Sequence, residues 1–404
     1  FRSYNIRVSS VPIASVADGI DVLIALDQET IALCAREVHN GGLILADSSF
    51  SPVLPEALQV SMVSVPLAEL AAKAGSAKMK NVAAVGMTVA MLGLAATKWE
   101  KPLNEEFAPK GDKILQENLA SLQNGWDYAM TMTDFAGRWK MEAGDGIPRL
   151  YVIGNETISR GAVAAGAKFM AAYPITPASE IMEIMVQRLP ELGGRMVQTE
   201  DEISACMMAI GANYAGVRAF TATSGPGLSL MAESIGLAAM TETPLVVIDV
   251  QRGGPSTGLP TKHEQSDVLA ALFSTHGEAP KIVLAPDSIA AAYQDTIEAF
   301  NLAEEFQCPV ILLSDMQLSL GVQTIAALPD ESPEQRRGNL MPADSLPELP
   351  KNHYFRRYQV TPDGISPRVI PGTKNGMHHS TGLEHDETGR PFEGTANRVA
   401  QTDK

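Results

Sequence analysis

The sequence predicts an α/β protein: two α/β domains in tandem, the second a doubly wound parallel sheet, followed by an extended C-terminal arm. Short, largely apolar runs such as residues 21–26 and 245–250 alternate with longer stretches whose apolar residues recur at helical spacing. Strands that are buried on both faces have such largely apolar runs, and helices cross between parallel strands. Polar turns rich in glycine and proline directly follow several of the runs, which predicts a ligand-binding edge.

Residues 1–103 form the first predicted domain. Its strands are expected at 21–26, 43–46 and 60–65. A helical pattern follows the first strand, and a long helix is predicted over 78–94. No GxGxxG motif follows a strand here, so we do not predict a dinucleotide site. Because the chain starts at Phe1 without any lead-in, we expect this domain to be truncated at its N-terminus.

Residues 104–149 are polar and helical in places, and we interpret them as a linker. The second domain, residues 150–328, has the clearest alternation of strand and helix patterns. Its predicted strands span 151–153, 169–172, 195–198, 219–222, 245–250, 281–284 and 310–314. Its predicted helices span 157–165, 178–189, 202–215, 227–240, 267–272 and 288–306.

The composition and patterning of the sequence change in residues 329–404, where long helical patterns and apolar strand runs are absent. Prolines and histidines are frequent there, as expected for an extended arm that crosses other surfaces. We expect the arm to lead to a further C-terminal domain, and Lys404 to end the chain without packing. His378, His379 and His385 stand beside Glu384, Asp386 and Glu387. The stretch lacks the i, i+4 histidine pair of zinc proteases, so we expect a structural or interface role and no metal site.

Composition excludes several classes of function. Lys and Arg number 31 against 47 Asp and Glu, giving a net charge of −16, so nucleic-acid binding is not expected. The three cysteines, Cys34, Cys206 and Cys308, are widely separated and form no CxxC, so this chain alone should hold neither an iron–sulfur cluster nor a zinc ribbon. A reducing, cytoplasmic compartment fits best. The longest apolar run, 82–97, is shorter than the ~20 residues that span a bilayer, so no membrane segment is expected.

Chemistry-bearing residues follow the strands of the second domain. Tyr173-Pro-Ile-Thr-Pro177 precedes a helix, where free backbone N–H groups stabilise anions. Gln198-Thr-Glu-Asp-Glu202 opens the next helix, and Thr223-Ser-Gly-Pro-Gly227 lets backbone approach a ligand closely. An acidic residue, then Gly211 nine residues later, then TSGPG is a specific combination. The following strand ends in Gln-Arg-Gly-Gly, which places Arg252 at the same edge.

This combination resembles the pyrimidine-binding domain of thiamine-diphosphate enzymes. The segments YPITPASEIM, QTEDE, TATSGPGLSLMAE and DVQRGGPSTGLPTKHEQSD are similar to those of the 2-oxoacid:ferredoxin oxidoreductases. With FRSYNIRV and DVLIALDQE ahead of them, the domain order resembles the fused gamma-alpha subunit of 2-oxoglutarate:ferredoxin oxidoreductase. The fold expected from this resemblance is a gamma-type α/β domain, a pyrimidine-binding domain and an arm.

The resemblance also implies roles for particular residues. Glu202 would lie beside the aminopyrimidine ring and favour the tautomer that acts as internal base, with Glu200 as the alternative. Thr176 and Arg252 would bind the substrate carboxylate, for which a planar guanidinium suits. Ser256, Thr257, Lys262 and His263 share this edge, and their roles stay open. The residues expected to contact the cofactor are Tyr173, Pro174, Ile175, Glu202, Thr223, Ser224 and Gly225.

The implied reaction is the CoA-dependent oxidative decarboxylation of 2-oxoglutarate to succinyl-CoA and carbon dioxide, or its reductive reverse, with ferredoxin carrying the electrons. Gly144-Asp-Gly146 is not followed by the Asn expected of a magnesium–diphosphate site, so we interpret it as a turn. Thiamine diphosphate would therefore be shared with a beta subunit that holds Mg²⁺ and a 4Fe–4S cluster, in a dimer of heterodimers. A pyruvate or broad 2-oxoacid enzyme is the alternative within the class, and a degenerate scaffold module is the non-enzymatic one.

Overall fold

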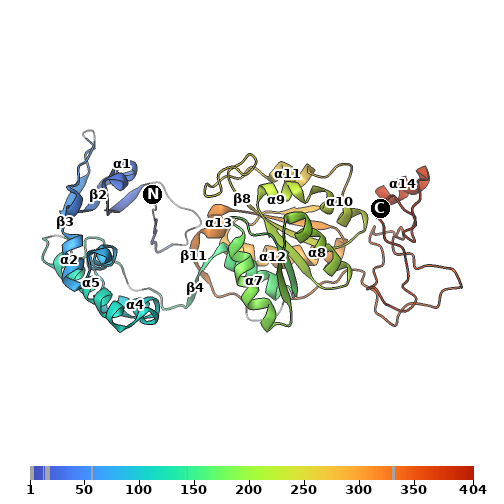
Figure 1. The fold of residues 1–404 in the computed structure, drawn as a ribbon, viewed down its shortest axis with the longest axis horizontal. Helices are drawn as coiled ribbons and strands as arrows, with labels where there is room; N and C mark the ends of the chain where they lie inside the picture. The colour runs from blue at the N-terminus through green and yellow to red at the C-terminus, as the bar shows by residue number, and fades with distance from the viewer. Residues whose placement is uncertain are drawn as a thin grey trace. The chain divides into compact units, whose positions relative to one another are not determined.

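The computed structural model describes residues 4–11, 13, 19–55, 58–133, 135–142, 144–329 and 333–404 (Figure 1). The chain divides into two units, Phe1–Ile147 and Pro148–Lys404, each with its own sheet and its own hydrophobic core. Both units are built on parallel strands, so the α/β fold class is confirmed.

The sheet of the first unit is parallel and has the order β1-β2-β3, with strands at Ile20–Ala25, Val38–Asp47 and Ser61–Val65. Alternate residues of β2 point to opposite faces. Leu43 and Leu45 join one core with α2, α3 and α5, whereas Ile44 and Ala46 join a second core with α1. The helices are α1 (Gln28–Cys34), α2 (Leu67–Ala74), α3 (Lys80–Met91), α4 (Glu100–Phe107) and α5 (Asp112–Met130). Short 3-10 turns lie at Ala35–Glu37, Ser48–Phe50, Ala77–Met79, Ala96–Trp99 and Ala108–Lys110.

The interpretation of residues 104–149 as a linker is wrong for its first part. Helix α5 packs along α3, and Ala129 belongs to the same core as Met87. Two glycines allow the close contact, because a Cβ at Gly86 would lie 2.0 Å from Leu122 O and one at Gly125 would lie 2.0 Å from Ala83 O. Polar residues on the exposed side of α5 had masked this buried helix face in the sequence.

The second unit contains a parallel six-stranded sheet of order β6-β5-β7-β8-β10-β9. Its central strands β7, β8 and β10 are buried along their whole length, as their largely apolar sequences predicted. The strands are β5 (Phe169–Ala172), β6 (Arg195–Gln198), β7 (Ala219–Thr223), β8 (Leu245–Gln251), β9 (Ile282–Leu284) and β10 (Pro309–Asp315).

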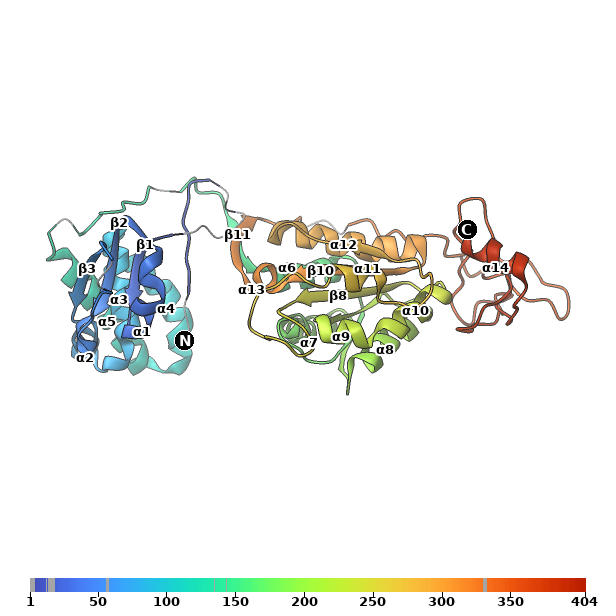
Figure 2. The ribbon, with the colours of Figure 1, turned by 90° about the horizontal axis from the view of Figure 1, so that it is seen from above.

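Helices cover both faces of this sheet, so β8 lies between α12 and α9 in Figure 2. On one face, Phe220, Ile248 and Leu312 pack against α6 (Gly154–Ala164), α7 (Ser179–Glu191) and α12 (Ile289–Phe306). On the other, Val247 and Ile311 pack against a second helical layer. That layer consists of α8 (Glu202–Tyr214), α9 (Gly225–Leu230), α10 (Ala232–Met240) and α11 (Val268–Phe273).

Two elements differ from the sequence prediction. The strand β4 (Arg149–Ile153) does not join the main sheet but pairs antiparallel with β11 (Val322–Ala326), which follows the short helix α13 (Met316–Leu320). The helix expected over 227–240 is divided into α9 and α10 at Met231.

The arm packs against the amino-terminal edge of the six-stranded sheet. Arg337 Nη2 donates to Gly216 O at 2.9 Å just before β7, and Arg357 pairs with Glu242 just before β8. The arm carries one described helix, α14 (Thr395–Thr402). The expectation of an unpacked end is wrong, because Lys404 pairs with Glu242, its side chain is only 10 % exposed, and its Nζ lies 3.0 Å from Ser366 Oγ.

A buried ion cluster fixes this edge. Glu304 near the end of α12 accepts from Arg218 Nε at 2.9 Å and from Arg368 Nη2 at 3.0 Å, and Arg337 Nε forms an ion pair with it at 2.7 Å. Burial lowers the pKa of Arg218 and of Arg368, and Glu304 opposes that effect. One carboxylate thus joins β7, α12 and two points of the arm.

We expect Glu304→Ala to destabilise the second unit by about 3–5 kcal/mol, because it leaves buried guanidinium groups without their counter-charge. Chemical denaturation of the full chain measures this. The control is Glu298→Ala, which removes the exposed pair with Arg336 on the same helix and should cost less than about 1 kcal/mol. Equal losses for the two variants would contradict the proposed role of the cluster.

Candidate active site at the carboxyl edge of the sheet

Four of the segments predicted to carry chemistry lie at one edge of the six-stranded sheet. They follow β5, β6, β7 and β8 at residues 173–177, 198–202, 223–227 and 252–266. Because these strands are parallel, their carboxyl ends share one edge, where ligands bind in open α/β sheets. The arm contacts described above lie at the opposite edge of the sheet.

Glu202 is the first residue of α8, and only 6 % of its surface is exposed. Asp201 caps this helix by accepting from Ser204 N at 2.7 Å. A Cβ added at Gly227 would lie 2.8 Å from Glu202 Oε1 and 2.0 Å from Thr223 Oγ1. The missing side chain at position 227 therefore lets the Glu202 carboxylate lie directly against the glycine-rich turn.

The two candidate glutamates occupy different environments. Glu200 is exposed, whereas Glu202 is buried at the turn. Gly211, nine residues after Glu202, lies on the same helix with open space where a Cβ would be. Contact with the glycine-rich turn thus distinguishes Glu202 from Glu200. No packing contact among the described residues explains why a glycine stands nine residues after Glu202.

The hydroxyl of Ser224 is buried and has no hydrogen-bond partner among the described residues. The next residue, Gly225, begins α9 against Asp267, whose Oδ2 would lie 2.9 Å from an added Cβ. A buried polar atom without a partner costs free energy unless a ligand or water satisfies it. The turn therefore carries a buried hydroxyl that has no partner among the described residues, and its glycine backbone can be approached closely by a neighbouring group.

Arg252 and Thr176 are brought together, as predicted. Arg252 Nη1 donates to Thr176 O at 2.6 Å, and Nη2 donates to Thr257 O at 2.9 Å. Arg252 is 6 % exposed, and no ion pair to it occurs in the described part of the chain. Thr176 is exposed and is followed by a cis peptide bond to Pro177. Because a buried charge is costly without a counter-charge, the guanidinium of Arg252 favours the binding of an anionic ligand.

The other predicted contact residues lie on the same segment. Tyr173 is 39 % exposed, Pro174 is half-buried, and Ile175 packs against the main core. Ile175 therefore anchors the segment, while Tyr173 stands open to a ligand or a neighbouring chain.

Sequence reasoning missed a buried carboxyl pair at this edge. Asp249 lies in β8, completely buried, within hydrogen-bonding reach of Asp267 at the start of α11. Burial first, and then the charge of Asp267, raise the pKa of Asp249 well above its usual value. The signal was present in the sequence, because Asp249 is the one charged residue in the apolar run 245–250.

The segment 252–266 is almost entirely exposed and is tied to its neighbours at a few points. Its Gln265 Nε2 donates to Asp315 Oδ2 at 2.7 Å, and His263 Nδ1 lies 3.2 Å from Asp315 Oδ1. Asp315 ends β10 and also caps α13. Two residues of the segment are therefore held by the next strand end.

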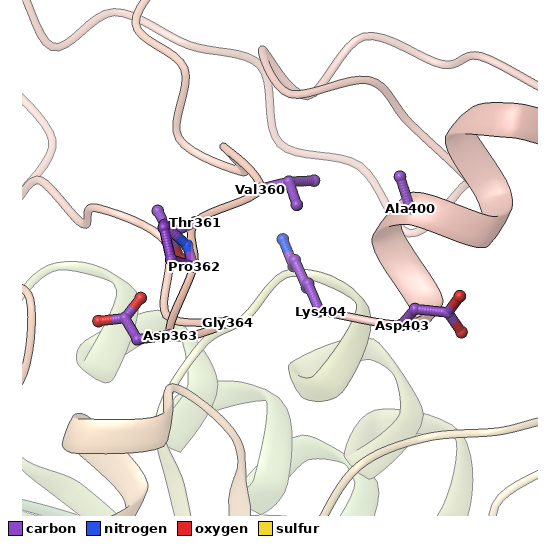
Figure 3. Close-up of a pocket in the computed structure, with 8 residues that line it drawn as sticks. All are labelled: Val360, Thr361, Pro362, Asp363, Gly364, Ala400, Asp403 and Lys404. Atoms are coloured by element: carbon purple, nitrogen blue, oxygen red, sulfur yellow. The ribbon is translucent and has the colours of Figure 1, made fainter.

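The other sequence candidates belong to other segments of the chain. Asp145 in the glycine turn accepts from its own segment at Ile147 N, 3.0 Å away. His385 is buried and packs against the Tyr358 ring at a tilt of 56°, with 4.1 Å between ring centroids, and Glu384 Oε2 accepts from Arg398 at 2.7 Å. No group of three or more possible metal ligands gathers within the described ranges. The shallow hollow in Figure 3, lined by residues of the arm, lies between 360–364 and the end of α14.

Comparison with known proteins places this geometry in a family. Residues 160–404 match the model described as pyruvate flavodoxin/ferredoxin oxidoreductase, thiamine diP-bdg, and residues 2–128 match pyruvate ferredoxin/flavodoxin oxidoreductase. The solved 2-oxoglutarate:ferredoxin oxidoreductase of Magnetococcus marinus, which has 2-oxoglutarate, coenzyme A and succinyl-CoA bound, is 35 % identical with a TM-score of 0.90. The match covers 98 % of this chain and 69 % of that one.

Curated relatives agree. The chain is 32 % identical to the alpha subunit of 2-oxoacid:ferredoxin oxidoreductase 1 of Sulfurisphaera tokodaii, over 99 % of this chain and 70 % of the relative. It is 44 % identical to 2-oxoglutarate synthase subunit KorA of Methanothermobacter thermautotrophicus, over 60 % of this chain and 61 % of the relative. The chain therefore belongs to the alpha-subunit family of the 2-oxoacid:ferredoxin oxidoreductases. Among its described residues, no helix combines the length and apolar character needed to cross a bilayer.

We expect Gly227→Ala to lower the free energy of unfolding by about 1–3 kcal/mol, because the methyl group overlaps Thr223 and Glu202. The matched control is Gly236→Ala in α10, where a Cβ meets open space and helix propensity favours alanine by roughly 0.5–1 kcal/mol. Denaturant titration of both variants tests this difference in sign. A stabilised Gly227→Ala would contradict the close approach.

Proposed function

We propose that this chain is the alpha subunit of a thiamine-diphosphate-dependent 2-oxoglutarate:ferredoxin oxidoreductase. The enzyme would convert 2-oxoglutarate and coenzyme A to succinyl-CoA and carbon dioxide, or run the reductive reverse, with ferredoxin exchanging the electrons. The principal support is the position of Glu202, which is buried against the glycine-rich turn at the edge that also holds Arg252.

The residues of this edge suit the reactive half of thiamine diphosphate. The glycines of the turn 223–227 let Glu202 and Asp267 approach its backbone closely, and the buried Ser224 hydroxyl lacks a partner among the described residues. When bound, the cofactor supplies the nucleophilic carbon and the electron sink for loss of carbon dioxide. Glu202 would hold a proton at the nitrogen of the aminopyrimidine ring, and Tyr173, Pro174 and Ile175 would line the ring.

Arg252 and Thr176 would bind the carboxylate of the 2-oxoacid. Each Nη of a guanidinium carries two N–H groups, and the bonds to Thr176 O and Thr257 O use one on each nitrogen. The remaining N–H groups and the uncompensated positive charge suit a planar anion. The Thr176 side chain, exposed beside Arg252, would add a hydroxyl donor.

A beta subunit would complete the site with Mg²⁺, the diphosphate contacts and the 4Fe–4S cluster. Burial raises the pKa of Cys206 and of Cys308 to about 12, which disfavours the thiolate form that metals bind. The third thiol, Cys34, belongs to the first unit. The metal and cluster sites would thus lie on the beta subunit and the ring-binding residues on this chain. The assembly would be a cytoplasmic dimer of heterodimers with coenzyme A as co-substrate.

The preference for 2-oxoglutarate over pyruvate or a broad range of 2-oxoacids follows the names of relatives. Subunits from Methanothermobacter and Mycobacterium tuberculosis, 44 % and 33 % identical, are named for 2-oxoglutarate, and the Sulfurisphaera subunit for 2-oxoacids in general. Steady-state rates with 2-oxoglutarate and with pyruvate, measured on the complex with its partner subunit, test this preference.

For the complex with its partner subunit, Glu202→Gln should reduce turnover by roughly 10²–10⁴-fold, because the amide cannot exchange a proton with the cofactor ring. Glu200→Gln is the matched control at the exposed position and should retain activity. Complex assembly is followed by size-exclusion chromatography. Wild-type turnover in Glu202→Gln, or loss of turnover in Glu200→Gln alone, would reverse the assignment.

Arg252→Gln should raise the KM for the 2-oxoacid by about 10²-fold, corresponding to the loss of a charged hydrogen bond of roughly 2–3 kcal/mol. The KM for coenzyme A should stay within about twofold, since the proposed contact involves the oxoacid alone. Lys262→Gln removes an exposed cation from the same loop and serves as control. An unchanged oxoacid KM in Arg252→Gln would move the carboxylate site elsewhere.

A further inference from the structure

The base of the exposed segment 252–266, hereafter the edge loop, is closed by two carboxyl groups. Asp249 lies in β8 three residues before the loop begins, and Asp267 directly follows the loop at the start of α11. The Asp267 backbone N–H also donates to Gln251 Oε1 at 2.9 Å, and Gln251 Nε2 donates to Ser314 O at 3.1 Å. The two ends of the loop are thus joined where the loop leaves the sheet.

The carboxyl contact requires a proton. Asp249 is completely buried, and neither of its oxygens has a hydrogen-bond partner among the described residues. Asp267 Oδ2 is buried and equally unsatisfied, although the two side chains are within hydrogen-bonding reach. Two ionised carboxylates repel and offer acceptors only, whereas one proton between them makes a strong O–H···O⁻ bond.

No cation among the described residues acts on the pair. The remaining charge that acts on the pair comes from Glu264 in the edge loop. Asp249 pairs in register with Thr223 on β7 and with Leu313 on β10, so no described cation faces it from either strand. Burial raises the pKa of Asp267, and the hydrogen bond with Asp249 opposes that rise.

We propose that Asp249 and Asp267 share one proton and act as a latch that closes the base of the edge loop, with Asp249 donating its O–H to the Asp267 carboxylate. The latch holds Arg252 at one foot of the loop and presses Asp267 against Gly225 of the glycine-rich turn. Both aspartates are positioning residues, because they act on the site through Arg252 and Gly225.

The stability of the contact between Asp249 and Asp267 depends on pH. A carboxyl group whose pKa is raised in the folded state contributes stability below its unfolded pKa, and this contribution is lost as pH rises through the folded value. Ionisation of Asp249 replaces a hydrogen bond by repulsion between two buried charges. The loop base should therefore open at high pH and stay closed at low pH.

The first test uses the full 404-residue chain and needs neither cofactor nor partner. Infrared spectra at neutral pH should show the carbonyl band of a buried protonated carboxylic acid, and this band should vanish in Asp249→Asn. Trypsin cleavage after Lys262 in the edge loop should accelerate as pH rises through the raised pKa of Asp249. Correction for the pH dependence of trypsin comes from an unstructured peptide of the same loop sequence.

The variants separate the latch from a mere packing role. Asp249→Asn keeps a donor but cannot ionise, so its cleavage rate should stay flat with pH, and Asp267→Asn gives the same test if the first variant does not fold. Asp249→Leu removes the donor and should speed cleavage at least 10-fold at every pH. Asp287→Asn, an exposed aspartate, should keep the wild-type profile. Absence of the infrared band, or a wild-type pH profile in both Asn variants, would overturn the latch.

The link to the site rests on the proposed function, and a second measurement isolates it. In the complex with the partner subunit, Asp249→Leu should raise the KM for the 2-oxoacid about 10-fold, whereas Asp249→Asn should restore the value to within twofold. A latch confirmed by infrared and cleavage in a complex without oxidoreductase activity would remove the proposed function and leave the latch. The reverse result, activity without the band, would remove the latch alone.

Discussion

The site depends first on the parallel register of β5, β7 and β8. Parallel strands deliver their carboxyl ends to one edge, so residues separated by more than 70 positions, such as Thr176 and Arg252, become hydrogen-bonded neighbours. The contact at Gly227 depends on the same arrangement, since it needs the start of α8 and the end of β7 side by side. A break in this register would separate the glutamate, the glycine-rich turn and the arginine at once.

The two edges of the sheet have different roles. Salt bridges to Glu304 and Glu242 fix the arm at the amino-terminal edge, where charges are paired and buried. At the carboxyl edge, Arg252 is buried without an ion pair among the described residues. A buried charge without a counter-charge is costly unless a ligand compensates it. The two edges of the sheet therefore differ in whether their buried guanidinium groups are paired.

Much of this arrangement could be predicted from the sequence, because buried strands leave unbroken apolar runs and strand-end turns are rich in glycine and proline. The runs ending at Gln198 and Thr223 located the turns that flank Glu202. Helix α5 was missed because tertiary contact through Gly86 and Gly125, not its own composition, buries it. The role of Asp249 was missed because it depends on contact with Asp267. No local sequence pattern shows that two carboxyl groups 18 residues apart meet in the fold.

Arg252 joins the strand-end segment at Thr176 to the edge loop at Thr257 through one guanidinium group. An anion bound there and the order of the loop are then thermodynamically linked, and such coupling is reciprocal. A partner chain that orders the loop would raise the affinity for the anion. The bound anion would raise the affinity for that partner by the same factor. Substrate affinity and subunit affinity would thus be two measurements of a single coupling free energy.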